Sequence, residues 1–149
     1  RLPLHCSGDM YDAVPTVAYR LEHEGRVAVV LTDMGRPSAD VARALYGAHV
    51  LVLEFNHDVT MLRNGPYSPA LQRRILGNAG HLSNDQASEM LLGLAGPELH
   101  TLVLAHLSEH NNTPELALAS ARGTLAALGR DDVRVLVASQ SEVGPNLAV

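Results

Sequence analysis

Three predicted strands run directly into residues that could bind a metal ion or transfer protons. These residues are Asp33 after the strand 26–32, Glu54, Asn56, His57 and Asp58 at the end of the strand 48–54, and His106 after the strand 99–105. Ligand-binding groups gather at the carboxyl ends of strands in open α/β sheets. Carboxylate and imidazole groups are the usual ligands of borderline metals such as zinc and manganese. The pattern therefore predicts a metal site at one edge of a sheet.

A fourth candidate, His81 in "GHLSND", lies just before a predicted helix N-terminus, where backbone N–H groups favour an anion. Each candidate also has a purely structural interpretation. Asp33 could form an Asx turn, His106 could be a core histidine bonded to a backbone carbonyl, and residues 56–58 could cap a helix. Their shared position at strand ends favours a site over these alternatives.

Four further histidines lack this placement, and three arginines lie within the predicted helices. We interpret four histidines as surface or boundary residues: His23, His49, His100 and His110. Three arginines are interpreted as a solvated helical face rather than a phosphate clamp: Arg63, Arg73 and Arg74.

Strands alternate with helices along the chain, which predicts a layered α/β domain. Strands are expected over 14–21, 26–32, 48–54, 99–105 and 133–139, and helices over 38–46, about 57–63, 68–76, from residue 83, and 114–128. Ser83 and Gln86 have the spacing of a capping box, and Gly129 is a helix stop signal. No repeat or linker divides the chain.

Composition limits the possible classes of protein. The chain has 149 residues, 46% of them hydrophobic and 18% charged, which is typical of a globular domain. Its formal net charge of −5 excludes a polycationic nucleic-acid binder, so a phosphate-bearing substrate would need local positive charge. No apolar run is long enough for a membrane span. The single cysteine, Cys6, fits a reducing cytoplasm, and the start at Arg1 suggests a processed or truncated product.

Five segments resemble the C-terminal half of a metallo-β-lactamase-fold hydrolase. They are "VPTVAYRL", "RVAVVLTDMG", "LVLEFNHDVTMLRNGPYS", "RRILGNAGHLSNDQA" and "LVLAHLSEHNNTPELA". They are most similar to the bacterial branch related to ribonuclease Z and to single-stranded DNA exonucleases. The resemblance implies the C-terminal half of an αββα sandwich over residues 1–149, with the N-terminal metal-binding half absent.

The resemblance also implies a role for each candidate residue. Asp33 would bridge two divalent metal ions, zinc or manganese, and His106 would be the last histidine ligand. His81 would lie in the loop that approaches the scissile phosphate. Residues 56–58 would act beside the metals or in proton transfer, by analogy with a Glu/His motif in those relatives.

Two features depart from the family pattern. The "HxHxDH" cluster, which supplies four ligands from the N-terminal half, does not occur in this chain. Tyr11 stands where the family has a further histidine ligand, and His5 could replace that ligand if "CSGDMY" is an insertion before Asp12.

The complete enzyme implied by the resemblance hydrolyses phosphodiester bonds, with single-stranded nucleic acid or a small phosphodiester as substrate. We expect this chain alone to be inactive, as a fragment or as one subunit of a split enzyme that needs an N-terminal half. A hydrolase of small esters, lactones or cyclic phosphates is a further alternative, because this fold hosts many chemistries. The apolar sheet face normally covered by the other half could also drive homo-oligomer formation.

Overall fold

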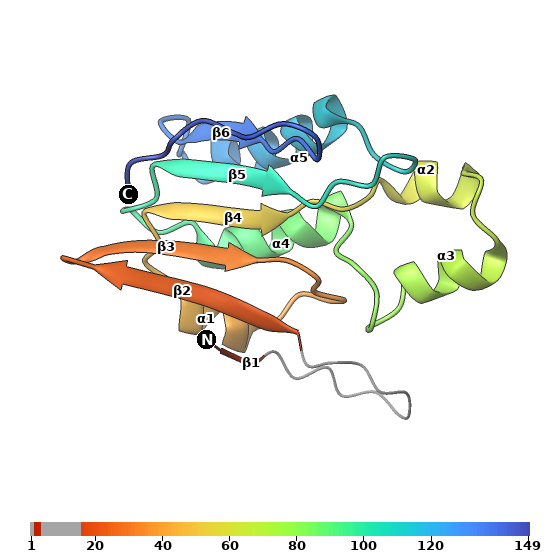
Figure 1. Cartoon of the computed structure of the whole chain (residues 1–149), viewed down its shortest axis with the longest axis horizontal. Helices are drawn as coiled ribbons and strands as arrows, with labels where there is room; N and C mark the ends of the chain where they lie inside the picture. Colours follow the sequence, from red (N-terminus) through yellow and green to blue (C-terminus); the bar gives the residue numbers. More distant parts are fainter. Residues whose placement is uncertain (1, 4–15) are drawn as a thin grey trace.

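The computed structural model describes residues 2–3 and 16–149, which form one sheet and five helices (Figure 1). The strands are β1 (Leu2–Pro3), β2 (Val17–His23), β3 (Arg26–Leu31), β4 (Val50–Glu54), β5 (Thr101–Ala105) and β6 (Arg134–Val137). The helices are α1 (Ala39–Leu45), α2 (Val59–Asn64), α3 (Pro69–Ile75), α4 (Asn84–Leu94) and α5 (Pro114–Ala127). The predicted alternation of strands and helices is confirmed.

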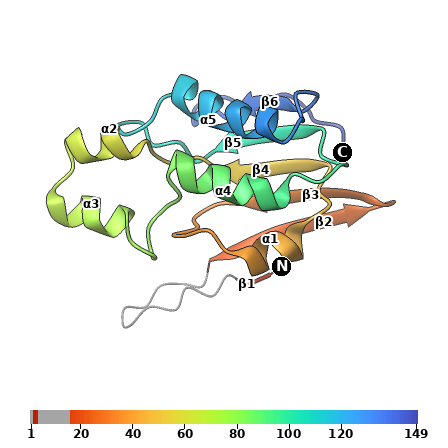
Figure 2. The ribbon, with the colours of Figure 1, turned by 180° about the vertical axis from the view of Figure 1, so that it is seen from behind.

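The six strands lie in sequential order, with β1 to β3 antiparallel and β3 to β6 parallel. Parallel neighbours need crossover connections, and such crossovers are almost always right-handed. Because all three crossovers step in the same direction across the sheet, their helices α1, α4 and α5 cover the same face (Figure 2). The helices α2 and α3 instead extend beyond the carboxyl ends of the parallel strands (Figure 1).

The core lies between the sheet and these three helices. Leu51 and Leu53 of β4 and Leu102 and Leu104 of β5 are fully buried there, because alternate residues of a strand point to the same face of the sheet. On α5, the buried residues Ala117, Ala121 and Leu125 recur every four positions, which places them on one helix face.

The opposite face of the sheet carries a continuous apolar row. Strand register aligns Tyr19, Val30, Val52, Val103 and Leu136, one from each strand from β2 to β6. Tyr19 is exposed and the other four side chains are partly exposed. Within the described part of the chain, no helix covers this face (Figure 1).

Helix boundaries follow the capping residues. Ser83 and Gln86 form the predicted capping box at the start of α4, and Thr113 caps α5, whose first residue is Pro114. Among the described helices, none is long and apolar enough to cross a lipid bilayer.

Candidate metal centre

Asp33 and His106 both have left-handed backbone conformations at the ends of their strands. Their φ angles are 60° and 58°, and among the described non-glycine residues only Glu24 shares this property. Side chains disfavour this region, so such residues persist where the surrounding structure holds them, often at functional sites. This conformation makes the chain turn sharply after β3 and after β5, at the same edge of the sheet.

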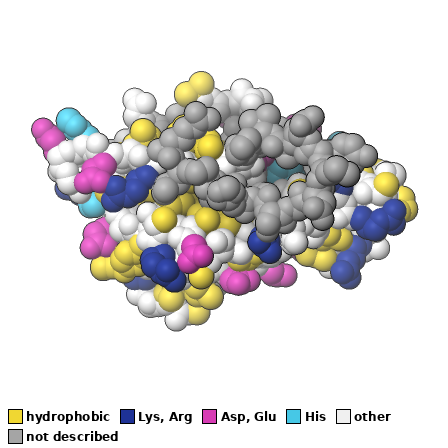
Figure 3. Space-filling model, turned by 90° about the horizontal axis from the view of Figure 1, so that it is seen from below, with side chains coloured by type: hydrophobic (Ala, Val, Ile, Leu, Met, Phe, Trp, Pro, Cys, Tyr) yellow, Lys and Arg dark blue, Asp and Glu magenta, His cyan; other side chains and the backbone are white. Residues whose placement is uncertain are grey.

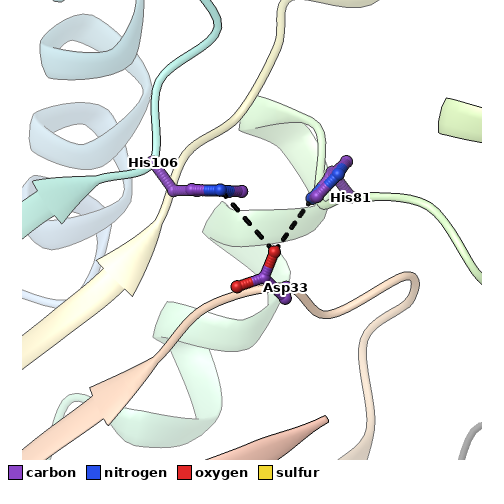
Figure 4. Close-up of side chains that lie close together, drawn as sticks. All are labelled: Asp33, His81 and His106. Carbon is purple, nitrogen blue, oxygen red and sulfur yellow. Dashed lines mark ion pairs between the residues drawn. The ribbon is translucent and has the colours of Figure 1, made fainter. Parts of the chain in front are cut away.

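Asp33, His81 and His106 converge at this edge (Figure 4). Asp33 Oδ1 lies 3.6 Å from His106 Nε2 and 3.8 Å from His81 Nδ1. One potential ligand atom from each residue lies within 4.8 Å of the others. Two ligands that share a tetrahedral zinc ion at ~2.1 Å would lie roughly 3.4 Å apart, so these donors suit a divalent ion. Asp33 and His106 thus meet as predicted, with His81 beside them.

The carboxylate of Glu54 holds the two histidines of this group in place. Its side chain is completely buried, and its Oε1 accepts hydrogen bonds from His106 Nδ1 and His81 Nδ1, both at 2.8 Å. Its Oε2 accepts a bond from the backbone N–H of Met34 at 2.9 Å, which ties the carboxylate to the Asp33 turn. A carboxylate only accepts hydrogen bonds, so both imidazole Nδ1 atoms must carry hydrogen.

This arrangement distinguishes the two histidines. The Nδ1–H of His106 points to Glu54, so its Nε2 has a free lone pair and faces Asp33, as in a carboxylate–histidine–metal arrangement. The His81 nitrogen nearest Asp33 is the one that donates to Glu54. The geometry therefore favours His106 over His81 as a metal ligand.

Electrostatics support a charged Glu54. Burial alone would raise the pKa of Glu54, but hydrogen bonds from His106, His81 and the Met34 backbone outweigh it and lower that pKa. The hydrogen bond to Glu54 raises the pKa of His106 against the opposing effect of burial, and the negative charges of Glu54 and Asp33 add to this. The site thus holds a buried negative charge beneath two imidazoles.

Residues 56–58 lie beside the centre in supporting positions. The amide nitrogen of Asn56 donates to the carbonyl of His106 at 2.8 Å and so holds that left-handed residue. His57 is buried, and its Nδ1 lies 3.3 Å from Asn56 Oδ1, while its Nε2 has no partner among the described residues. Burial lowers the pKa of His57 to about 4, so the ring is neutral near pH 7. Asp58 Oδ1 accepts from Met61 N at 2.7 Å and caps α2, the structural alternative given above.

A buried asparagine pair links the loops around the centre. Asn112 and Asn84 exchange side-chain hydrogen bonds of 2.9 and 3.0 Å, and Asn112 also donates to the carbonyl of Phe55 at 2.8 Å. Sequence reasoning missed this pair and the central role of Glu54. A carboxylate at the end of an otherwise apolar strand was the available signal for Glu54.

Other predicted residues lie as follows. His5 falls outside the described residues, as do Tyr11 and Asp12. His49 and His100 lie together at the opposite edge, with ring centroids 6.3 Å apart, in keeping with boundary residues. His110 is exposed as expected but lines a pocket of about 740 Å³ beside the centre.

Comparison with solved structures identifies the architecture. The structure matches that of the metallo-β-lactamase fold protein YhfI of Bacillus subtilis with a TM-score of 0.55. The match covers 84% of this chain and 42% of the YhfI chain. This chain has the metallo-β-lactamase fold. At 17% identity the likeness concerns the fold alone, and it confirms the predicted fold class.

Two relatives are similar in sequence to this metallo-β-lactamase-fold chain. The exodeoxyribonuclease WalJ of Streptococcus pneumoniae is 39% identical over 110 residues, which cover 74% of this chain and 41% of WalJ. The exodeoxyribonuclease YycJ of Bacillus anthracis is 36% identical over 122 residues, which cover 82% of this chain and 46% of YycJ. The chain thus spans less than half the length of these relatives. They confirm the predicted resemblance to the nuclease-related branch, although no protein-family profile matches the chain.

Proposed function

We propose that this chain contributes to a metal-dependent nuclease that hydrolyses phosphodiester bonds of single-stranded nucleic acid in an exonuclease-like manner. The observation that carries the proposal is the convergence of Asp33 with His81 and His106, whose rings both hydrogen-bond to the buried carboxylate of Glu54. The similarity of the chain to two exodeoxyribonucleases supports nucleic acid as the substrate. A cytoplasmic location, which the lone Cys6 favours, belongs to the same proposal.

Two divalent ions, zinc or manganese, would complete the centre. Asp33 would bridge them and His106 would hold one through Nε2, which faces the Asp33 carboxylate at 3.6 Å. When bound, such ions supply positive charge that polarises a phosphodiester and acidifies water. In this role, Glu54 fixes the tautomer and orientation of His106.

His81 would serve as a proton donor rather than a ligand. Its Nδ1 donates to Glu54, so a second proton on the ring resides on Nε2. The Nε2 of His81 is therefore the atom that would pass a proton to a leaving oxygen. Asn56 and His57 would position His106 through its carbonyl, and Asp58 would act only through the α2 cap.

The remaining metal ligands would come from a segment outside these 149 residues that carries "HxHxDH". The described residues offer only one group of three potential ligands, too few for two complete metal sites. The apolar row from Tyr19 to Leu136 gives this segment a surface to cover. The lengths of the two relatives are compatible with such a division.

A hydrolase of small neutral esters has less support. The pocket beside the centre has apolar walls that include Leu71 and Ile75, but it is also lined by Arg74 and by His81, His106 and His110. These basic groups suit an anionic substrate, and a neutral ester would not need them.

Joining the chain to a segment that carries "HxHxDH" tests the proposal. We expect the purified 149-residue chain with zinc or manganese to leave labelled single-stranded DNA intact. A fusion to the unmatched part of WalJ should degrade it, and the same fusion with Asp33→Asn should not. Degradation by the chain alone, or an inactive but folded and metal-loaded fusion, would overturn the proposal.

A further inference from the structure

We propose that α2, α3 and their connection form a docking arm for the sugar-phosphate backbone of single-stranded nucleic acid, next to the metal centre. The inference rests on the proposed function for the identity of the polymer. It replaces our interpretation of these arginines as a solvated helical face.

The charge of the arm is opposite to that of the molecule. Residues 59–75 contain Arg63, Arg73 and Arg74 and no Asp or Glu, so this segment has a formal charge of +3 in a chain of net charge −5. All three arginines are exposed. Their guanidinium groups form no hydrogen bond or ion pair with any residue that the structure describes. At the α3 end of the molecule, the space-filling view shows arginine side chains and no acidic ones (Figure 3).

The arm borders the pocket that leads to the centre. The 740 Å³ pocket is lined by Tyr67 and Arg74 from the arm and by Glu109 and His110 from the β5–α5 loop. It is also lined by His81, whose Nδ1 lies 3.8 Å from Asp33 Oδ1. This volume is within the roughly 300–1,000 Å³ of pockets that hold small ligands. Glu109 would repel a phosphate, so the backbone should follow the Arg74 side.

An aromatic pair in the pocket suits a base. The rings of Tyr67 and His110 meet edge to face, with centroids 5.9 Å apart and an interplanar angle of 88°. Proteins that hold single strands combine such aromatic surfaces with arginines along the backbone. A purely acidic protein partner would need the arginines but not this pair.

Close backbone packing fixes the arm relative to the centre. A Cβ atom on Gly35 would lie 1.9 Å from the carbonyl oxygen of Asn78, and one on Gly80 would lie 1.9 Å from that of Ile75. The backbone N–H of His81 also donates to the Ile75 carbonyl at 3.1 Å. The last turn of α3, which carries Arg74, therefore holds a set distance from Asp33.

Binding of a fluorescent oligothymidylate of about ten nucleotides to the 149-residue chain tests the arm. Anisotropy is measured in EDTA across ~50–200 mM salt, so the readout is independent of hydrolysis. We expect Arg73→Gln with Arg74→Gln to weaken binding about tenfold at the lowest salt. The slope of log affinity against log salt should fall by about 1.4, since each phosphate contact contributes ~0.7 for single strands.

The controls separate this surface from general charge effects. Arg122→Gln with Arg134→Gln removes two exposed arginines elsewhere and should leave the slope unchanged. Arg73→Lys with Arg74→Lys should restore it, and Tyr67→Ala should weaken binding about fivefold with the slope retained. Circular dichroism checks that each variant is folded.

Three results would overturn the proposed role of the arm. They are no binding of the oligonucleotide by the unmodified chain, an equal loss of affinity in the Arg73/Arg74 and Arg122/Arg134 glutamine variants, and equally tight binding of an oligoglutamate of the same charge. Binding that follows the arm while the joined protein hydrolyses nothing would overturn only the proposed function. Hydrolysis with unchanged binding by the Arg73/Arg74 variant would overturn only the arm.

Discussion

At the scale of single residues, one buried carboxylate explains the arrangement of the centre. Glu54 accepts bonds from His81, His106 and the Met34 backbone, and so it connects three loops that are distant in sequence. Such a charge is stable in the interior only while its donors remain in place. Two predictions concern buried titratable residues of the centre, Glu54 and His57.

Glu54→Gln should weaken zinc binding by about 10–100-fold although residue 54 is not a ligand. An amide oxygen lacks the negative charge that orients both imidazoles and that strengthens His106 Nε2 as a metal ligand. Isothermal titration of the chain with zinc measures the change, and Glu89→Gln on the exposed side of α4 is the control. Equal affinity in both variants would contradict this role for Glu54.

His57 should make the chain less stable in mild acid. Its pKa falls from 6.5 to about 4 on burial, so between these values the unfolded state binds a proton that the folded state does not. Stability is therefore lost as pH falls below 6.5, by about 2 kcal/mol at pH ~5 relative to pH ~7.5. Urea unfolding at both pH values should show that His57→Gln lacks this component; an identical pH dependence would refute the assignment.

At the scale of secondary-structure elements, caps and apolar runs determine what could be predicted. Thr113, Pro114 and Gly129 limit α5 locally, and its predicted bounds agree with the structure within one residue. Asp33 and His106 could be placed at one edge because parallel strands end there together. Their left-handed conformations and the bonds to Glu54 depend on contacts between distant loops, which a local pattern does not contain.

The loop between α3 and α4 should tolerate no side chain at Gly80. A methyl group there would collide with the carbonyl oxygen of Ile75, so Gly80→Ala should destabilise the fold by roughly 1–3 kcal/mol. Gly123→Ala on α5 is the matched control, because nothing lies within 4 Å, and alanine there should stabilise by about 1 kcal/mol. Thermal unfolding of both variants measures these changes. An unchanged free energy of unfolding in Gly80→Ala would show that this loop can move away from α3.

At the scale of the whole molecule, the two faces of the sheet differ. Three helices cover one face, while the other carries the apolar row from Tyr19 to Leu136 (Figures 1 and 2). Exposed apolar surface of this extent favours association. The proposed N-terminal segment would cover this face and also supply further metal ligands.

The isolated chain should therefore self-associate through this face. Val52→Glu, at the middle of the row, should shift the chain toward monomers in sedimentation velocity. Leu92→Glu alters an exposed leucine on the helical side and should leave association unchanged. Monomeric behaviour of the unmodified chain would contradict this prediction.

Hydrolysis of single-stranded DNA by the joined protein, measured for Asp33→Asn against Asp40→Asn, tests the central claim most directly. Asp33 faces both imidazoles of the centre, whereas Asp40 pairs with Arg43 on the exposed side of α1. We predict that Asp33→Asn lowers kcat/KM at least ~1,000-fold, equivalent to about 4 kcal/mol of transition-state stabilisation, and that Asp40→Asn leaves it unchanged. Equal activity of the two folded variants would contradict a metal-dependent nuclease centred on Asp33 and His106.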